Sequence, residues 1–346
     1  MSARPLNATT LQRVMELVPP EKLRVSLAPP GLLRRKRPHR ILAVGGGKGG
    51  IGKSLVSANL GIALAKAGHR VLLVDADLGG ANLHTCLGVA QPAVTLSDFV
   101  NKRVERLEDL VVPTGVPNLS LIAGALDVLD AANPKHTQKQ KLLRNLQALD
   151  VDYLVLDLGA GTSFNVLDFF LIADHGVLVL LPEPTSVENA YRFVKAALFR
   201  RLQSLAEEYG IEDQVERAMS TRDSSLKTPQ DFIARVSLRD AAAGARLGKD
   251  LESMRIKLIV NQVRTAADQN VGQQVVGAWK KFFGLEMELL GGIPYDDEAW
   301  RAVRKRRPLM LERPECAAAV QLHGIAQRLL TLDGRPLVEP QAFKTP

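Results

Sequence analysis

Short apolar runs alternate with amphipathic helical patterns along the chain from Arg40 onward. Runs such as 153–156 and 177–181 are apolar at every position, so both faces of the predicted strands must be covered. A parallel sheet with helices packed on each face provides that cover. The alternation therefore predicts an α/β fold with a doubly wound, mostly parallel sheet flanked by helices. The predicted strands are 41–44, 71–74, 119–122, 153–156, 177–181 and 257–260.

Two further patterns predict where helices begin. Thr228-Pro-Gln-Asp231 combines an N-cap residue, a proline at the first helical position and an acid in the first turn. It lies in the charged stretch 205–253, where we expect a helical insertion, a pair of helices on the rim of the sheet. Thr185-Ser-Val-Glu188 is a capping-box pattern and predicts a helix start there.

A glycine-rich loop follows the first predicted strand. Gly45-Gly-Gly-Lys-Gly-Gly-Ile-Gly-Lys-Ser54 leads into a helical pattern, and residues 47–54 match the spacing G-x-x-x-x-G-K-[ST]. In that pattern backbone N–H groups at a helix N-terminus face phosphates, Lys53 reaches the β/γ-phosphates and the Ser54 hydroxyl ligates Mg²⁺. The sequence therefore predicts a nucleotide site. Its predicted loop residues are Gly47, Gly49, Gly50, Ile51, Gly52, Lys53 and Ser54.

Carboxylates follow two of the predicted strands. Asp157 comes directly after a buried strand, and Asp75 and Asp77 follow the strand at 71–74. The carboxyl ends of parallel strands form the ligand-binding edge of such a sheet, so Asp157 is placed to hold a Mg²⁺-bound water. Asp75 and Asp77 are two residues apart on extended backbone and point to one side, toward the loop. The alternative is that these acids cap or solvate turns.

A second lysine, Lys48, stands five residues before Lys53 and gives the sequence Lys-Gly-Gly-Ile-Gly-Lys-Ser. This loop resembles the deviant Walker A loop of the MinD/ParA family of P-loop ATPases. The resemblance covers nearly all of residues 40–332, and the segments 75–83, 157–163 and 260–263 are similar to its switch and adenine-binding segments. The stretches 182–191 and 292–296 look similar to the flagellar-number regulators of the FlhG/FleN type within that family.

The resemblance implies a homodimer that forms face to face in the ATP-bound state, with ATP and Mg²⁺ as cofactors. Lys48 would reach the partner subunit's phosphates, Asp77 would orient the attacking water, and Asp75 would join Ser54 and Asp157 around the metal. Asn261 offers a donor and an acceptor that match adenine, and it lacks the acid of a guanine signature, so ATP is favoured over GTP. The other residues expected at the base or at the dimer and switch surfaces are Pro294, Asn82, Gly161 and Glu183.

The sequence departs from FlhG-type proteins at both ends. It lacks their activating motif near the N-terminus, Asp-Gln-Ala followed by Leu-Arg, and their C-terminal amphipathic helix for the membrane. The helical pattern with Leu322, Ile325 and Leu329 is expected to close the core instead. The 333–346 stretch beyond it contains three prolines and does not suit a helix.

The net charge of +8 is concentrated at the N-terminus. Residues 1–40 hold nine Lys/Arg against two acids, so the remaining chain carries only +1. We expect 1–38 to be a basic, proline-rich arm with a short amphipathic helix around Leu11 to Val18. This arm is either a solvated linker or makes weak contact with nucleic acid or an anionic membrane.

Composition excludes several classes of protein. The two cysteines, Cys86 and Cys316, have no partner at C-x-x-C spacing, which argues against a disulfide framework and a metal cluster. The histidines form no H-x-x-x-H pair, so no metal beyond Mg²⁺ is expected. Without an apolar run of roughly 20 residues or an export signal, the chain is expected in the cytoplasm, with peripheral contact at the inner membrane as an open alternative.

Two function hypotheses remain. The first is a slow, Mg²⁺-dependent ATPase that dimerises with ATP, is stimulated by an unidentified protein partner, and controls the position or number of a cellular structure. The alternative is a ParA-like partition ATPase that binds DNA without sequence preference through basic residues at 301–307. Iron–sulfur carriers of this fold need paired cysteines and the related tyrosine kinases need a C-terminal tyrosine cluster, and the sequence has neither. The predicted regions are the arm 1–38, the ATPase domain 39–332 and a proline-rich tail 333–346.

Overall fold

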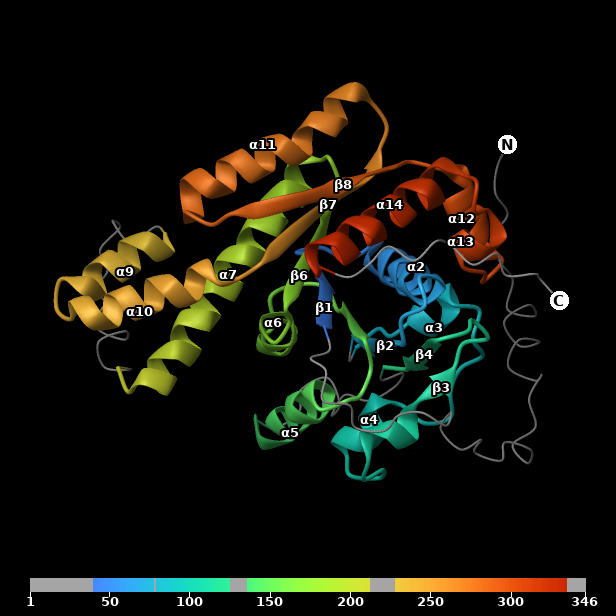
Figure 1. Ribbon diagram of the computed structural model, residues 1–346, viewed down its shortest axis with the longest axis horizontal. Helices are drawn as coiled ribbons and strands as arrows, with labels where there is room; N and C mark the ends of the chain where they lie inside the picture. The colour runs from blue at the N-terminus through green and yellow to red at the C-terminus, as the bar shows by residue number, and fades with distance from the viewer. Residues whose placement is uncertain (1–39, 78, 125–135, 212–227, 335–346) are drawn as a thin grey trace, which may run out of the picture.

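The computed structural model describes residues 40–77, 79–124, 136–211 and 228–334, which are arranged around one eight-stranded sheet (Figure 1). The strand order is β3-β4-β2-β5-β1-β6-β7-β8. Every neighbouring pair is parallel except β3 with β4. The predicted doubly wound, mostly parallel sheet is therefore confirmed. The strands are β1 (Arg40–Gly45), β2 (Val71–Ala76), β3 (Val112–Pro113), β4 (Leu119–Ile122), β5 (Tyr153–Leu158), β6 (His175–Leu180), β7 (Ile256–Val263) and β8 (Met287–Pro294).

All six predicted strands are present, and most extend a few residues beyond the predicted bounds. β3 and β8 were not predicted. β3 has only two residues, and in β8 the pair Gly291-Gly292 interrupts the apolar run. β8 lies at the edge of the sheet and pairs only with β7, so its residues need not be apolar on both faces.

Consecutive residues of the central strands pack into two separate cores. Ile41 and Ala43 contact the side covered by α5, α6, α7 and α11, whereas Leu42 and Val44 contact the side covered by α2 and α14. This alternation follows from the two-residue period of a strand. The helices are α2 (Lys53–Lys66), α3 (Leu83–Cys86), α4 (Leu96–Val100), α5 (His136–Gln147), α6 (Phe164–Leu171), α7 (Pro184–Tyr209), α9 (Pro229–Ser237), α10 (Ala241–Glu252), α11 (Ala266–Phe283), α12 (Asp297–Arg304), α13 (Leu309–Glu312), α14 (Ala317–Leu332) and the 3₁₀ helix η1 (Leu107–Leu110).

The helix α14 closes one core, as its apolar pattern predicted. Leu322, Ile325 and Leu329 have no exposed surface. Asp333, which we assigned to the tail, also packs with the domain. Its carboxylate accepts hydrogen bonds from the Tyr153 hydroxyl at 2.9 Å and from Nε2 of His175 at 2.8 Å. The end of α14 is thereby attached to β5 and β6.

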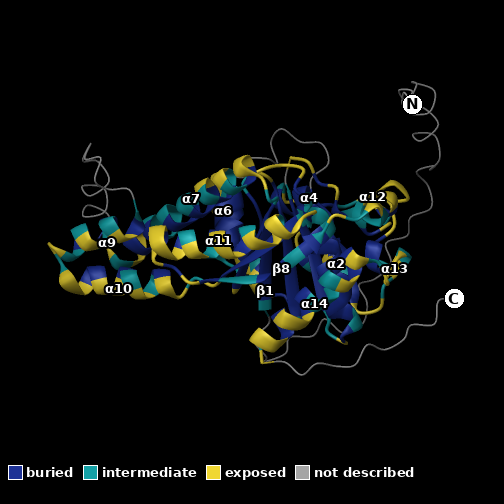
Figure 2. Cartoon of the chain, turned by 90° about the horizontal axis from the view of Figure 1, so that it is seen from above, coloured by how far each residue is buried: buried dark blue, intermediate teal, exposed yellow. Residues whose placement is uncertain are grey.

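The helices α9 and α10 lie at the far end of α7 and project beyond the sheet, as Figures 1 and 2 show. Their start is the one predicted, because Thr228 is the N-cap and forms a reciprocal capping box with Asp231. Phe232 and Val236 of α9 and Leu247 of α10 are buried between the helices and the end of α7.

The helix predicted from the capping-box pattern is present as α7, but Thr185 is not its N-cap. α7 begins at Pro184 with Glu183 as N-cap, two residues before the predicted cap, and has no side-chain cap. The proline at the first helical position sets the start, and the Ser186 hydroxyl accepts a hydrogen bond from the Leu181 N–H at 2.9 Å. The arm 1–38 with its predicted amphipathic helix, and residues 335–346 of the tail, lie outside the described residues. Within the described ranges, no helix has the length and apolar character needed to cross a membrane.

Candidate functional site

The glycine-rich loop lies at the centre of the sheet, after β1 and between β5 and β6. Gly50 and Gly52 have φ angles of 76° and 92°, a backbone conformation that other residues rarely adopt. A Cβ at Gly47 would overlap the backbone of Asn189 in α7. Gly52 is the N-cap of α2 and provides no side chain to bind the first N–H groups of the helix, so these remain available to an anion.

Lys53 begins α2 and turns back toward the loop. Its side chain is buried, and Nζ donates a hydrogen bond to the carbonyl oxygen of Lys48 at 3.4 Å. Burial lowers the pKa of Lys53, and the carboxylates of Asp157 and Asp77 oppose that effect. A buried ammonium group thus faces the loop on one side and two carboxylates on the other.

Asp75 of β2 and Asp157 of β5 are directly paired in the register of two parallel strands. Both are nearly inaccessible, with 1% and 2% of their surface exposed. The two oxygens of Asp75 accept hydrogen bonds from the Asp77 N–H at 3.2 Å and the Leu83 N–H at 2.9 Å. Burial, and then the charge of Asp157, raise the pKa of Asp75 to about 7.

Asp157 contacts the first turns of α2. Its Oδ1 accepts a hydrogen bond from the Ser57 hydroxyl at 2.9 Å, and the single proton of this hydroxyl is shared with the carbonyl oxygen of Lys53 at 3.0 Å. Burial raises the pKa of Asp157 to about 6, although the hydroxyls of Ser54 and Ser57 and the charge of Lys53 lower it. Ser57 was not among the predicted site residues. It could have been found from its position one helical turn after Lys53, on the same face of α2.

These groups fit a magnesium ion bound together with nucleotide phosphates. The Ser54 hydroxyl and the carboxylate of Asp157 are hard oxygen donors, and the raised pKa values of Asp75 and Asp157 indicate buried negative charge that a cation would stabilise. In the described part of the chain, no three His, Cys, Asp or Glu side chains form a metal site by themselves. Mg²⁺ commonly takes only one or two protein carboxylates beside phosphates and waters.

Asp77 is half-buried after the end of β2. Its Oδ1 accepts a hydrogen bond from the Gly79 N–H at 3.2 Å. A Cβ at Gly159 would lie 3.1 Å from the same oxygen, so the carboxylate of Asp77 lies against the segment that follows Asp157. The structure therefore brings Asp75, Asp77 and Asp157 together beside Lys53.

Asn261 is turned toward the loop by an irregularity in β7. The register with β8 shifts between Val260 and Val263, and Gln262 has a positive φ of 58°. The buried Asn261 amide donates to the carbonyl oxygen of Ile51 at 2.9 Å, and its oxygen accepts from the Gln262 N–H at 3.0 Å. One amide hydrogen and one oxygen lone pair remain for a base. Pro294 pairs with Val263 on the adjacent strand, close to Asn261.

The remaining predicted residues lie on loops at the same edge of the sheet. Lys48 is exposed together with Gly49 and Gly50. Asn82 and Glu183 are the exposed N-cap residues of α3 and α7. Gly161, with a φ of 89°, lies in the loop after β5. Lys48 belongs to the phosphate loop, and Asn82, Gly161 and Glu183 follow the parallel strands β2, β5 and β6 at the same edge of the sheet.

Comparison with known proteins agrees with this geometry. A family model named ParA, described as NUBPL iron-transfer P-loop NTPase, matches residues 37–204. The antiactivator FleN of Pseudomonas aeruginosa is 27% identical over 294 residues, which cover 84% of this chain and 86% of that protein. The septum site-determining protein MinD of Synechocystis is 36% identical over 158 residues, which cover 45% of this chain and 58% of that protein.

Solved structures show the same fold. MinD of Pyrococcus horikoshii, complexed with Mg-ADP, has a TM-score of 0.59 at 23% identity and covers 86% of this chain and 98% of that protein. A ParA family ATPase from Chlorobium tepidum has a TM-score of 0.55 at 17% identity and covers 84% of this chain and 98% of that protein. The phosphate loop lies within the part that the ParA model matches, and the chain is similar to FleN and MinD in sequence and to MinD and a ParA family ATPase in fold.

Proposed function

We propose that this protein is a Mg²⁺-dependent ATPase that dimerises when ATP is bound and thereby controls the position or number of a cellular structure. The convergence of Lys53, Asp77 and Asp157 at the phosphate loop carries this proposal. FleN is named an antiactivator and MinD a septum site-determining protein, and both are similar to this chain along its sequence. We propose a regulatory output of the same kind here.

Each residue has a role in the proposed reaction. The N–H groups at the start of α2 and the Lys53 ammonium bind the β/γ-phosphates, because both are directed at the loop. Ser54 and Asp157 hold Mg²⁺, which supplies positive charge to the phosphate oxygens when it is bound. Asp75 contributes negative charge to that site and fixes the Asp77 and Leu83 N–H groups. Asp77 accepts a hydrogen bond from the attacking water and orients it.

The specificity for ATP rests on Asn261 and Pro294 at the ends of β7 and β8. Asn261 keeps one donor and one acceptor, which suit the adenine edge. Asn261 is already hydrogen-bonded to Ile51, so a base that binds there is coupled to the phosphate loop.

The proposed dimer joins two phosphate loops face to face. Lys48 is exposed beside Gly49 and Gly50 and has no hydrogen bond or ion pair from its side chain to another described residue, which suits a lysine that reaches the partner subunit's phosphates. Asn82, Gly161 and Glu183 surround the same face and would contact the partner subunit. We propose a cytoplasmic protein with a separate activating partner. We also propose a division into the arm 1–38, the ATPase domain 39–332 with a helical insertion at 205–253, and the tail 333–346, whose first residue, Asp333, packs against the domain.

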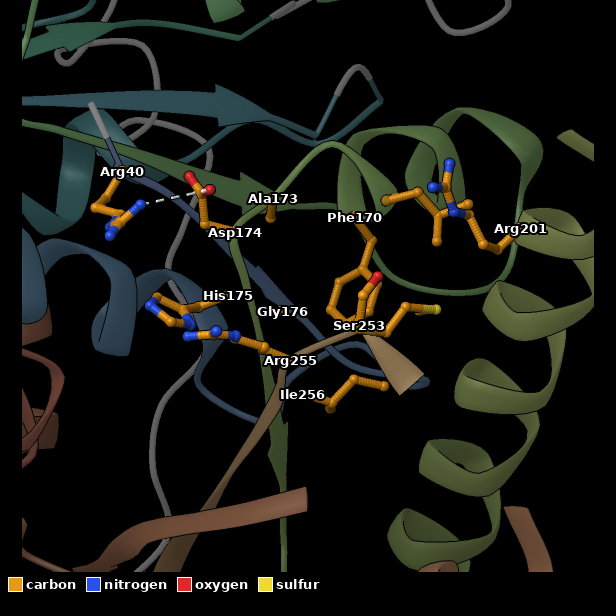
Figure 3. A pocket seen from close by; sticks show the side chains of 12 residues that line it. Arg40, Phe170, Ala173, Asp174, His175, Gly176, Arg201, Ser253, Arg255 and Ile256 are labelled. Carbon is orange, nitrogen blue, oxygen red and sulfur yellow. Dashed lines mark ion pairs between the residues drawn. The ribbon is translucent and has the colours of Figure 1, made fainter. Parts of the chain in front are cut away.

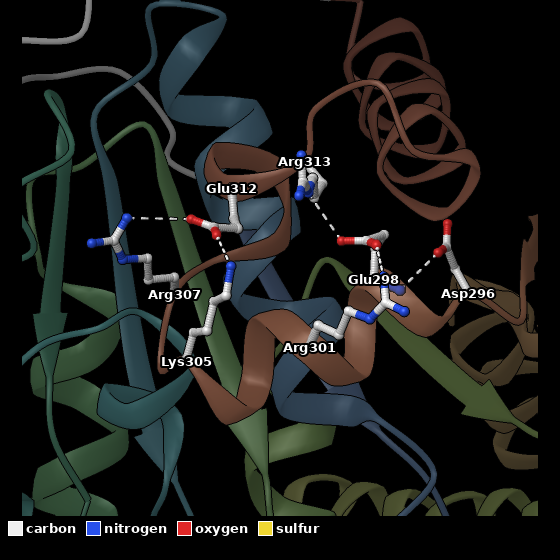
Figure 4. A network of polar contacts seen from close by, with 7 residues as sticks. All are labelled: Asp296, Glu298, Arg301, Lys305, Arg307, Glu312 and Arg313. Atoms are coloured by element: carbon white, nitrogen blue, oxygen red, sulfur yellow. Dashed lines mark hydrogen bonds and ion pairs between the residues drawn. The ribbon is translucent and has the colours of Figure 1, made fainter.

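A second candidate is a partition ATPase that binds DNA through the basic segment 301–307. Figure 4 shows that much of this charge is paired within the protein: Glu298 binds Arg301 and Arg313, and Glu312 binds Lys305 and Arg307. Arg304 lies over the Trp300 ring at 4.7 Å, and Arg306 is exposed. Arg304 and Arg306 are therefore the cations best placed to contact DNA phosphates.

The test is size-exclusion chromatography of the Asp77→Ala variant with ATP and Mg²⁺. We expect a stable dimer, because nucleotide binding remains while hydrolysis stops. The Lys53→Ala variant is the control and should stay monomeric, with ATP affinity reduced at least about tenfold through loss of a charge-assisted hydrogen bond. Parallel runs with anionic liposomes and with DNA test whether the protein binds an anionic membrane or DNA. An Asp77→Ala protein that hydrolyses ATP at the normal rate would refute the assigned role, and salt-sensitive DNA binding would favour the second candidate.

A further inference from the structure

A cavity of about 390 Å³ opens at the amino edge of the sheet, opposite the phosphate loop (Figure 3). It lies where α10 leads into β7. Arg255 and the first residues of β6, His175 and Gly176, line it from the sheet, and Phe170 of α6 and Arg201 of α7 line it from the helices. Its volume is within the usual range of small-molecule sites, about 300–1,000 Å³.

Two guanidinium groups of this cavity have no acidic partner among the described residues. Neither Arg201 nor Arg255 forms an ion pair or a hydrogen bond from its side chain to another residue in the described ranges. Figure 3 shows Arg255 extending past Gly176 toward His175. Arg40, by contrast, is paired with Asp333 at 3.0 Å and with Asp174, whose carboxylate also lines the cavity, at 4.0 Å (Figure 3). The unpaired charge of the cavity is therefore positive.

His175 contributes a buried polar atom without a partner. The residue is 2% exposed, and its Nε2 bonds to Oδ1 of Asp333 at 2.8 Å. Burial raises the pKa of Asp333, but the hydrogen bonds from His175 and Tyr153 outweigh burial and leave it below its usual value. Since the Asp333 carboxylate only accepts, Nε2 carries the proton. Nδ1 is buried and unbonded within the described ranges, so this ring nitrogen lacks a hydrogen-bond partner.

The floor of the cavity is apolar. The Phe170 ring packs directly on Gly176, where a Cβ would overlap it. Met254 and Ile256 continue this surface at the start of β7. The cavity thus combines an apolar floor, two guanidinium groups without a partner among the described residues, and a ring nitrogen without a hydrogen bond.

We propose that this cavity binds a small-molecule phosphate monoester with an aromatic or apolar body. The forked donors of arginine match phosphate oxygens, and the apolar body would lie on Phe170 and Met254. A phosphate monoester carries about −1.5 to −2 charge at neutral pH, and its oxygens can accept or, in the monoanion, donate a hydrogen bond at Nδ1 of His175. A sulfonate carries one negative charge and has no proton to donate.

The test uses phenyl phosphate and benzenesulfonate, titrated into the full chain and followed by calorimetry at pH 6.5. We expect saturable binding of phenyl phosphate, at least about tenfold tighter than that of benzenesulfonate. Arg255→Ala and Arg201→Ala should each weaken it about tenfold or more, because each removes a charge-assisted hydrogen bond. Arg255→Lys should recover part of the affinity, since it keeps the charge but not the fork.

Two controls separate this site from others. Arg239→Ala removes an exposed arginine from the turn between α9 and α10 and should leave binding unchanged. Lys53→Ala disables the phosphate loop and should also leave it unchanged, so the result does not depend on the proposed ATPase. No saturable binding, equal affinity for the sulfonate, equal weakening by Arg239→Ala, or loss of binding in Lys53→Ala would each overturn the proposal. Unchanged melting temperatures would exclude unfolding as the cause of any loss.

Discussion

The hydroxyl of Ser57 donates a hydrogen bond to Oδ1 of Asp157 across 2.9 Å and joins α2 to the end of β5. Both residues are almost fully buried, so this bond has no competition from water. Because Ser57 is in α2 together with Lys53 and Ser54, the bond positions Asp157 relative to these two residues. The phosphate loop and the proposed magnesium ligand are thereby held in one rigid unit.

Replacing Ser57 with Ala should weaken the Mg²⁺ dependence of nucleotide binding. Loss of the hydroxyl removes a hydrogen bond that lowers the pKa of Asp157, so more of this carboxyl is protonated at neutral pH. We expect Mg²⁺ affinity in the presence of ATP to fall several-fold and the free energy of unfolding to fall by about 1–3 kcal/mol. Titration with Mg²⁺ at constant ATP measures the first effect. Ser97→Ala is the control, because Ser97 is buried in α4 and its hydroxyl has no partner in the described residues. If Ser97→Ala lowers Mg²⁺ affinity equally, the proposed effect of Ser57 is excluded.

Gly47→Ala should destabilise the nucleotide-free protein. An added Cβ would overlap the Asn189 backbone of α7, so the loop or the helix must move. We expect a loss of about 1–3 kcal/mol, as for other overpacked sites. Gly49→Ala is the matched control, because its Cβ would meet only Ala160, at 3.8 Å. Urea unfolding of both variants tests this, and equal stability of the two would show that the loop is not held against α7.

Lys48→Ala should separate ATP binding from dimerisation. Its exposed side chain forms no ion pair among the described residues, so its removal should leave ATP affinity of the monomer nearly unchanged. Dimer formation with ATP should fall at least about tenfold if Lys48 reaches the partner subunit's phosphates. Analytical ultracentrifugation in the Asp77→Ala background measures this. A dimer of normal strength would remove Lys48 from the interface.

The contribution of Asp75 and Asp157 to the stability of the nucleotide-free protein should fall as pH rises from about 4 to about 7. Burial, and the charges of other carboxylates, raise the pKa of Asp75 to about 7 and that of Asp157 to about 6, above their unfolded values near 3.8. In this window the folded state binds more protons than the unfolded state, so a rise in pH favours unfolding. Melting temperatures across this range test the effect, and Asp75→Asn should flatten the slope. If Asp75→Asn leaves the wild-type slope unchanged, the pH dependence arises from other groups.

Asp168→Asn should cost about 3 kcal/mol of stability. Asp168 of α6 is ion-paired with Lys139 of α5 and with Arg200 of α7, at 2.7 Å for Arg200 Nε, and all three side chains are at least partly buried. Neutralising Asp168 leaves the buried Lys139 ammonium without its partner. Lys280→Ala breaks the exposed pair with Glu286 and should change stability by less than about 1 kcal/mol. Urea unfolding compares the two variants. Equal losses in the free energy of unfolding would show that burial does not strengthen the Asp168 ion pairs.

Much of the fold could be predicted because it follows from patterns of neighbouring residues. The apolar runs at 71–74 and 153–156 are strands that are buried on both faces, as consecutive apolar residues require. β8 could not be predicted in the same way, because an edge strand needs no continuous apolar run. The start of α7 was misplaced since Thr185 and Pro184 both carry helix-start signals, and the proline at the first position prevailed.

By itself the sequence determined the phosphate loop, the helix that follows it and the strands that contain Asp75 and Asp157 near their carboxyl ends. These features depend on the spacing of neighbouring residues, which acts within a few positions of the chain. Only the tertiary structure decided that Asp75 pairs with Asp157, that Asn261 binds Ile51 and that Asp333 binds Tyr153 at the amino edge of the sheet. Strand register and contacts between distant segments arise from packing the whole chain, and no local pattern specifies them.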